Sequence, residues 1–144
     1  MTDQATERMQ VDAPLERCYE VASDFERYPE WAGGIKQVTV VDRDDQGRPR
    51  RVTYRAGGLG RSVSYTLEYS YDEAPGRLGW VQVAGDLTRR LDGEYVFAAR
   101  DGGTEVTYHL LAELKVPIPG FVKRRAETLV LGTALKDLKR RIES

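Results

Sequence analysis

The chain has 144 residues, which is enough for one domain with a substantial core. Hydrophobic residues make up 40% and charged residues 31%, as in an ordinary globular protein, and the formal net charge is −1. No stretch approaches the roughly 18 consecutive apolar residues that a membrane span needs, and the start of the chain lacks the basic and apolar regions of a signal peptide. We therefore expect a single domain over residues 1–144, located in the cytoplasm.

The chain has one cysteine, Cys18, and one histidine, His109. A single cysteine cannot form an internal disulfide, which fits a reducing compartment. A zinc site normally uses several histidine or cysteine ligands, so we expect neither a metal nor a cofactor.

The hydrophobic pattern predicts helices only near the two ends of the chain. Residues 4–11 suit a first strand, and Asp12-Ala13-Pro14 then begins a helix, because proline is tolerated in a first turn. Leu15, Cys18, Ala22 and Phe25 recur at helical spacing, and a second short helix ends near Tyr28. Six strands follow, near 35–43, 50–56, 63–71, 77–84, 87–99 and 104–114, and a long helix runs from about 119 to 142.

Short turns separate all of the predicted neighbouring strands after the second helix. The turns lie at 44–47, 57–60, 75–76, 85–86 and 101–103, and they are rich in glycine, aspartate and proline. Strands joined this closely pair antiparallel. The predicted fold class is α+β, in the order β-α-α-β-β-β-β-β-β-α. The glycine cluster at 57–60 joins two strands, whereas phosphate-binding glycine loops precede a helix, so a nucleotide site is not expected.

Strand parity assigns one set of side chains to the inner face of the sheet. Residues 63–71 show the cleanest alternation, and Leu67 serves as the inward reference. The side chains that share this face are Val52, Tyr54, Val63, Tyr65, Leu67, Tyr69, Leu78, Trp80, Gln82, Leu87, Arg89, Leu91, Gly93, Tyr95, Phe97, Val106, Tyr108, Leu110 and Ala112. Aromatic and aliphatic groups with scattered polar ones are typical of a small-molecule pocket.

Tyrosine is unusually common on this face for a closed core. A buried tyrosine hydroxyl needs a hydrogen-bond partner, so five tyrosines indicate a cavity that is partly polar, unless some lie at strand ends with their hydroxyls in solvent. The same parity places Glu68, Glu94, Glu105, His109 and Glu113 on the outer face. No general base is then expected inside, which argues against an enzyme.

The long helix carries two apolar arcs on nearly opposite sides. Leu131, Leu135, Leu138 and Ile142 form one arc, which should pack on the sheet. This orientation turns Arg124, Glu127 and Thr128 toward the hollow in the first half of the helix. The second arc contains Val122, Ala126, Leu129, Val130 and Thr133. It either contacts a membrane or a protein through the 116–130 region, or packs on the short helices after a bend at Gly132.

Charge is unevenly distributed along the chain. Residues 1–30 carry three Lys/Arg and eight Asp/Glu, whereas residues 119–144 carry seven Lys/Arg and three Asp/Glu. The simplest interpretation is a solvated helix face balanced by the acidic N-terminal part. A basic helix also suits anionic lipid, while no nucleic-acid partner is expected.

Several short motifs, in this order, resemble the START-like (SRPBCC) superfamily, and more closely its polyketide cyclase/dehydrase and coenzyme-Q-binding branch. They are Val11–Val21, Asp24, Tyr28-Pro29-Glu30-Trp31, Leu91–Phe97, Gly103–Val106, Pro117-Ile118-Pro119 and Leu135–Lys139. The resemblance covers nearly the whole chain. It implies a helix-grip fold, in which a curved antiparallel sheet of about seven strands wraps round the C-terminal helix and encloses a hydrophobic tunnel. Where relatives usually have Trp in a Gly-x-Trp pattern, this chain has Tyr95.

The resemblance and the inner face together predict binding or transport of a hydrophobic small molecule of lipid, isoprenoid quinone or polyketide class. One alternative is a polyketide aromatase/cyclase-dehydratase, and another is an interaction module that uses the basic C-terminal helix. Arg89 or Arg124 would meet a polar group of the ligand, and Ile118 and Phe121 would form a movable lip. The complete set of expected ligand-binding residues is Trp31, Tyr54, Tyr65, Leu67, Tyr69, Trp80, Gln82, Arg89, Leu91, Tyr95, Tyr108, Leu110, Ile118, Phe121, Arg124 and Thr128.

Overall fold

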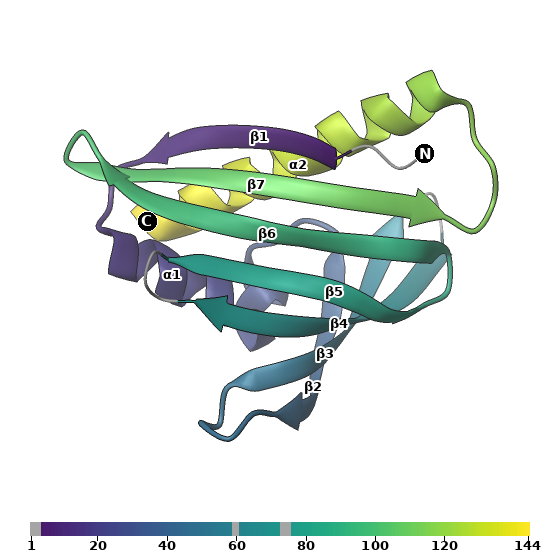
Figure 1. Ribbon diagram of the computed structural model, residues 1–144, viewed down its shortest axis with the longest axis horizontal. Helices are drawn as coiled ribbons and strands as arrows, with labels where there is room; N and C mark the ends of the chain where they lie inside the picture. Colours follow the sequence, from purple (N-terminus) through teal and green to yellow (C-terminus); the bar gives the residue numbers. More distant parts are fainter. Residues whose placement is uncertain (1–3, 59–60, 73–75) are drawn as a thin grey trace.

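The computed structural model describes residues 4–58, 61–72 and 76–144 (Figure 1). The elements are β1 (Gln4–Val11), α1 (Leu15–Ser23), the 3₁₀ helix η1 (Phe25–Glu30), β2 (Ile35–Arg43), β3 (Pro49–Gly58), β4 (Arg61–Asp72), β5 (Arg77–Gly85), β6 (Thr88–Arg100), β7 (Gly103–Leu114) and α2 (Gly120–Glu143). The predicted α+β class and element order are confirmed. The predicted turns at 57–60 and 75–76 lie partly outside the described residues.

All seven strands form one antiparallel sheet in the order β1-β7-β6-β5-β4-β3-β2. Consecutive strands from β2 to β7 are neighbours because their connections are short. In the β6–β7 hairpin, Asp101 and Gly102 have φ values of 51° and 79°, the left-handed backbone that a tight two-residue turn requires. The N-terminal strand β1 closes the sheet by pairing with β7, from Gln4 opposite Leu111 to Val11 opposite Thr104.

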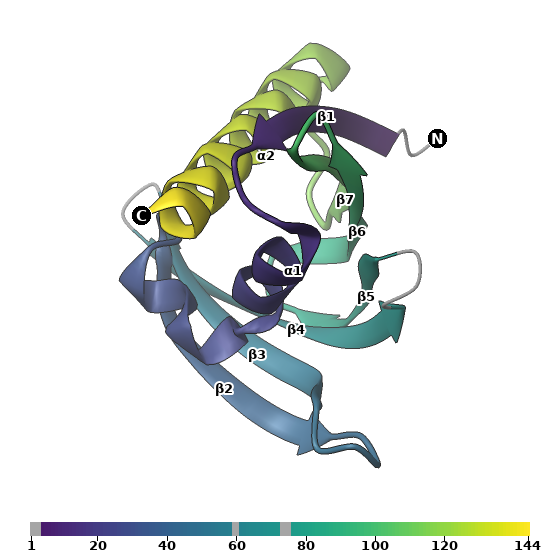
Figure 2. The same ribbon diagram turned by 90° about the vertical axis from the view of Figure 1, so that its left-hand side faces the viewer.

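The curled sheet has one hollow side, and the helices lie on that side (Figure 2). α2 runs beside β1 rather than across the middle of the sheet (Figures 1 and 2). Its predicted stripe of Leu131, Leu135, Leu138 and Ile142 is buried. None of the helices in the described chain is long and apolar enough to cross a membrane.

The tightly packed core occupies one end of the hollow side, where α1 lies. Side chains from α1, η1, β5, β6 and β7 are almost fully enclosed there: Cys18, Ala22, Phe25, Leu78, Phe97 and Val106. Since α1 has only nine residues, it covers only part of the sheet. The remaining concave surface forms the wall of a cavity.

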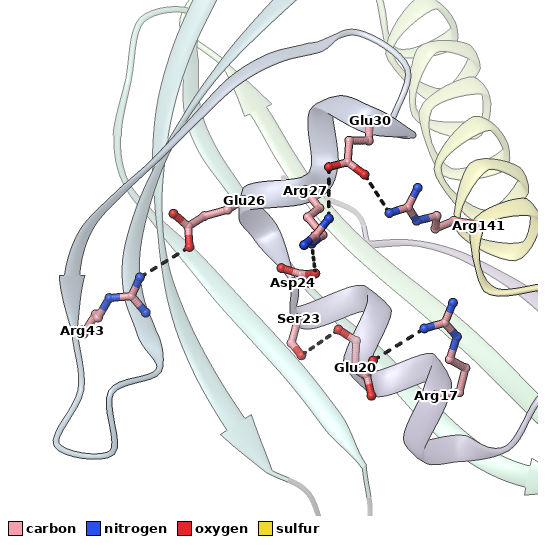
Figure 3. Close-up of polar contacts among 9 residues, drawn as sticks. All are labelled: Arg17, Glu20, Ser23, Asp24, Glu26, Arg27, Glu30, Arg43 and Arg141. Carbon is pink, nitrogen blue, oxygen red and sulfur yellow. Dashed lines mark hydrogen bonds and ion pairs between the residues drawn. The ribbon is translucent and has the colours of Figure 1, made fainter.

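A network of ion pairs holds η1 between β2 and α2 (Figure 3). Glu30 at the end of η1 contacts Arg141 of α2 at 2.8 Å and Arg27 at 3.4 Å. Arg43 of β2 reaches Glu26 at 3.5 Å. Exposed pairs of this kind add little stability individually. Together they hold η1, and with it the start of the segment that follows, in place against β2 and α2.

Candidate ligand-binding cavity

A cavity of about 700 Å³ lies between the concave face of the sheet, the segment 31–35 and α2. Its volume falls within the range of ligand pockets. The lining side chains are mostly apolar or aromatic. The described lining residues are Tyr28, Trp31, Ala32, Gly33, Gly34, Ile35, Tyr54, Ala56, Gly57, Tyr65, Leu67, Tyr69, Trp80, Leu91, Tyr95, Tyr108, Leu110, Ala126, Leu129, Val130, Thr133, Ala134 and Asp137.

Aromatic rings form a band across the strands that make the wall. Tyr95 on β6 lies opposite Tyr108 on β7, and their ring centroids are 4.7 Å apart. The indole of Trp80 on β5 lies 5.4 Å from the ring of Tyr95. Tyr54 and Tyr65 stack across β3 and β4 at 5.4 Å. These strand neighbours share a face because directly paired residues of an antiparallel sheet point the same way.

The mouth of the cavity is bordered by the segment after η1 and by α2. Asp137 Oδ2 accepts a hydrogen bond from the Gly33 backbone N–H at 2.9 Å, and the same carboxylate lies 3.6 Å from Arg140. This bond and the Glu30–Arg141 pair both join α2 to this part of the chain. They fix one side of the mouth, while the first half of α2 forms the other.

Six tyrosine hydroxyls belong to the lining, and they fall into two groups. The Tyr54 and Tyr69 hydroxyls bond to each other at 2.5 Å, and the Tyr28 hydroxyl donates to the Ala22 carbonyl. The hydroxyls of the other three tyrosines, Tyr65, Tyr95 and Tyr108, make no hydrogen bond to the described residues. The one fully enclosed side-chain nitrogen or oxygen without a hydrogen-bond partner in the described chain is Arg51 Nε, which lies 3.8 Å from the Glu68 carboxylate. The three free hydroxyls are therefore open to the cavity.

Burial keeps these phenols neutral. Desolvation raises the pKa of Tyr65 to about 12. The pKa values of Tyr95 and Tyr108 are also raised, mainly by desolvation and further by the neighbouring tyrosines. At neutral pH the three hydroxyls are consequently hydrogen-bond donors and not bases.

Charged groups are almost excluded from this surface. Among the described lining residues, Asp137 is the one acidic side chain, and there is no lysine, arginine or histidine. Nor do three or more His, Cys, Asp or Glu side chains gather as a metal site anywhere in the described ranges. Two smaller hollows, of about 240 and 370 Å³, are lined largely by ion-paired surface residues such as Arg27 and Arg77.

A family model described as polyketide cyclase / dehydrase and lipid transport matches residues 2–143. The chain belongs to this family. Solved structures agree about the fold. A START superfamily protein from Mycobacterium smegmatis superposes with a TM-score of 0.90 at 24% identity, with 97% of each chain covered. A protein from Thermus thermophilus gives a TM-score of 0.81 at 26% identity, also with 97% of each chain covered.

An enzyme is among the structural neighbours. The Zhui aromatase/cyclase from Streptomyces sp. R1128 superposes with a TM-score of 0.84 at 14% identity, over 99% of this chain and 94% of that one. At this identity the likeness shows the fold alone. A comparison with curated proteins finds no match. The START-like, helix-grip fold expected from the sequence motifs is thus confirmed.

Strand parity correctly places most of the expected residues on the cavity wall. Ten of the sixteen line the cavity: Trp31, Tyr54, Tyr65, Leu67, Tyr69, Trp80, Leu91, Tyr95, Tyr108 and Leu110. Their role in ligand binding remains a proposal. Sequence reasoning missed Tyr28, which stands three residues after Phe25 and packs its ring against Trp31 at 4.9 Å. The helical spacing of Phe25 and Tyr28 is the signal that could have revealed it.

Two expected polar contacts from the sheet lie elsewhere. Arg89 is exposed and pairs with Glu113 at 3.5 Å, because the β6–β7 register shifts between Thr88 and Arg90. Such a bulge inserts one residue and breaks the alternation. The Gln82 amide nitrogen donates to the Thr88 backbone carbonyl at 2.8 Å. Gln82 on β5 thus bonds to the start of β6 and is not part of the described lining of the cavity.

The expected contacts from the start of α2 also lie outside the lining. Arg124 and Thr128 are exposed, and the Thr128 hydroxyl bonds to the Arg124 carbonyl at 3.0 Å. Phe121 is exposed and Ile118 is partly buried, but neither lines the cavity. Instead the opposite arc borders the mouth, through Ala126, Leu129, Val130 and Thr133. The prediction that this arc faces away from the hollow is wrong, because α2 packs on β1 and α1 and leaves the cavity at its side.

Proposed function

We propose that this protein binds or carries a hydrophobic small molecule of lipid, isoprenoid quinone or polyketide class inside its cavity. The cavity of about 700 Å³ with its aromatic wall is the observation that supports this function. When a ligand covers apolar surface that is not already packed in the core, water is released from that surface and the free energy of the system falls. The family description, which includes lipid transport, supports the same activity.

A fluorescent probe tests the proposal directly. N-phenyl-1-naphthylamine is uncharged and brightens in apolar surroundings, so it should bind saturably to the wild-type protein. Ala56→Phe places a ring at the cavity wall and should lower the affinity for the probe about tenfold or more, which corresponds to about 1.4 kcal/mol of binding free energy. Val81→Phe is the matched control, since Val81 is exposed and lies outside this cavity. Equal affinities in the two variants would contradict the proposal, as would the absence of saturable binding.

Polyketide cyclisation is a second candidate, supported by the family description and by the aromatase/cyclase neighbour. In that reaction the tyrosine hydroxyls would polarise carbonyl groups of a folded chain. The described lining offers no histidine or lysine as a base, so this activity ranks below binding. If cyclisation of a poly-β-ketone persists in a Tyr65→Phe/Tyr108→Phe double variant, the hydroxyls have no such role.

The first half of α2 suggests how a ligand reaches the mouth. Five large apolar side chains between 116 and 130 are exposed: Val116, Phe121, Val122, Leu129 and Val130. Leu129 and Val130 also border the cavity. Lys115, Arg124 and Arg125 are exposed in the same segment. Apolar and cationic groups together match an anionic bilayer surface, so we propose transient docking of this segment on such a membrane.

Vesicle binding tests the docking surface separately from the cavity. The wild-type protein should co-sediment with vesicles containing phosphatidylglycerol and less with pure phosphatidylcholine. A Phe121→Ser/Val122→Ser variant, which leaves the described cavity lining intact, should lose this binding, and Val41→Ser/Val81→Ser, two exposed valines of β2 and β5, should keep it. Equal sedimentation of both variants would overturn the docking proposal. Vesicle binding that survives in Ala56→Phe would show that the basic helix acts independently of cavity access.

A further inference from the structure

The polar groups of the cavity wall are concentrated in one kind of side chain. Tyr65 on β4, Tyr95 on β6 and Tyr108 on β7 each present a hydroxyl to the same cavity. Tyr95 and Tyr108 are direct neighbours across two paired strands, with their ring centroids 4.7 Å apart. Trp80 packs against both rings, at 5.4 and 5.7 Å. The wall therefore combines flat apolar surface with hydroxyl donors from three strands.

These three hydroxyls differ from the other hydroxyls of the lining. Tyr54 and Tyr69 satisfy each other, and Tyr28 donates to a backbone carbonyl. Tyr65, Tyr95 and Tyr108 have no acceptor among the described residues. Buried polar groups are nearly always paired in folded proteins. No described residue accepts from these three hydroxyls, so their acceptor comes from what occupies the cavity: water in the free protein, or an acceptor atom of a bound ligand.

The charge of the lining restricts that acceptor. A carboxylate or phosphate placed on the wall would meet no lysine, arginine or histidine among the described lining residues. An anion removed from water without a counter-charge is strongly disfavoured. The one charged side chain of the described lining is Asp137, which adds negative charge near the mouth. An uncharged oxygen acceptor, such as a ketone or quinone carbonyl, has no comparable desolvation cost.

We propose that the cavity selects an uncharged, flat, ring-containing ligand whose carbonyl oxygen accepts hydrogen bonds from the hydroxyls of the paired Tyr95 and Tyr108. This specificity rests on the proposed binding function and narrows it. Within the classes named above, it favours quinone-like and cyclised polyketide-like molecules over fatty acids and other carboxylates. The aromatic wall recognises the ring system through offset and edge contacts, and the hydroxyls recognise the carbonyl.

Three tricyclic probes of nearly equal shape separate these effects. Fluorene carries no polar group, 9-fluorenone adds a carbonyl, and fluorene-9-carboxylate adds a negative charge at neutral pH. Each is measured by displacement of N-phenyl-1-naphthylamine from the wild-type protein. We expect 9-fluorenone to bind about threefold to tenfold more tightly than fluorene, as one or two net hydrogen bonds would give. Fluorene-9-carboxylate should bind at least about tenfold more weakly than 9-fluorenone.

Hydroxyl removal then identifies the donors. In Tyr95→Phe/Tyr108→Phe the preference for 9-fluorenone over fluorene should shrink to less than about twofold, while fluorene affinity stays unchanged. Tyr71→Phe is the control, because the Tyr71 hydroxyl donates to the Pro49 carbonyl and Tyr71 is not part of the cavity lining. Thermal unfolding followed by circular dichroism confirms that each variant is folded. If the double variant fails to fold, the single variants Tyr95→Phe and Tyr108→Phe and the wild-type ranking of the three probes still test the proposal.

The outcomes separate this specificity from the binding function itself. Equal affinities for fluorene and 9-fluorenone, or tightest binding of the carboxylate, would overturn the specificity and leave the binding function intact. A carbonyl preference that persists undiminished in the double variant would also overturn it. If none of the three tricycles displaces a probe that itself binds saturably, the specificity fails and the binding function stands; if the probe does not bind at all, both proposals fail.

Discussion

At the scale of single residues, Gly93 shows how the aromatic wall is built. Gly93 on β6 lies opposite Trp80 on β5. A Cβ atom at Gly93 would lie 2.7 Å from Trp80 Cζ2 and 2.6 Å from the His109 backbone oxygen. Real Cβ atoms do not approach other heavy atoms this closely, so only glycine lets the indole lie across β6. The position of Trp80 on the cavity wall thus depends on glycine at position 93, which has no side chain.

Gly93→Ala should destabilise the protein, because the added methyl group forces Trp80 or the β6–β7 ladder to move. Overpacking of this kind costs about 1–3 kcal/mol. Gly132→Ala is the matched control: apart from its chain neighbours and the backbone of its own helix, no atom lies within 4 Å of its Cβ position, and alanine in a helix interior should add about 0.5–1 kcal/mol. Urea unfolding measures both free energies. A Gly93→Ala protein as stable as the wild type would contradict this account of the wall.

Strand parity succeeds at residues whose strands are regular and fails where one residue is inserted. Tyr54, Tyr65, Tyr95 and Tyr108 are found on the wall because the β3–β4 and β6–β7 ladders are continuous around them. Arg89 stands at the register shift near the start of β6. Nothing in the local sequence marks that shift, because a bulge depends on how the two paired strands meet rather than on the residues of one strand.

At the scale of elements, two faces of α2 contact different parts of the molecule. Leu131, Leu135, Leu138 and Ile142 are buried toward β1 and α1, while Leu129, Val130 and Thr133 border the cavity mouth. Helical periodicity correctly predicts the first stripe. It cannot tell that the helix runs beside β1, which is a tertiary feature, and so it cannot tell which side of the helix meets the hollow. This is the reason that Arg124 and Thr128 were wrongly predicted to face the ligand.

The two surfaces of α2 should respond differently to truncation. Leu131 is 1% exposed and Leu129 is 70% exposed, although only one residue separates them. Leu131→Ala should lower the free energy of unfolding by about 2–5 kcal/mol through loss of buried contacts. Leu129→Ala should change it by less than about 0.5 kcal/mol. Urea unfolding of the two variants makes the comparison, and a large loss in Leu129→Ala would show that this arc is packed rather than exposed.

At the scale of the whole molecule, the sheet has a packed end and a hollow end. α1 and η1 fill the packed end with Cys18, Ala22 and Phe25, while the tyrosine-rich end is left for a ligand. The sequence motifs predict this architecture well, because order and spacing of strands determine it. They do not predict which hydroxyls remain free, because that depends on ring packing between strands.

The buried tyrosines make stability sensitive to alkaline pH. Their ordinary pKa is 10.0, and burial raises the pKa of Tyr65 to about 12 and those of the other five cavity tyrosines above the ordinary value. A raised folded-state pKa means that the folded protein holds the phenol proton more tightly than the unfolded chain does. The contribution to stability is complete below pH 10 and is lost as pH rises from about 10 through the folded-state pKa.

We therefore expect the free energy of unfolding to fall steeply above pH 10, by up to about 1.4 kcal/mol per pH unit for each buried phenol. Urea unfolding between pH 8 and 11 gives the slope, and absorbance at the phenolate wavelength shows when the phenols ionise. Tyr65→Phe should make the slope shallower, because one phenol that titrates in the unfolded chain is removed. Tyrosines that ionise near pH 10 without loss of structure would mean that water reaches their hydroxyls freely, and the cavity would then be too wet to favour an apolar ligand.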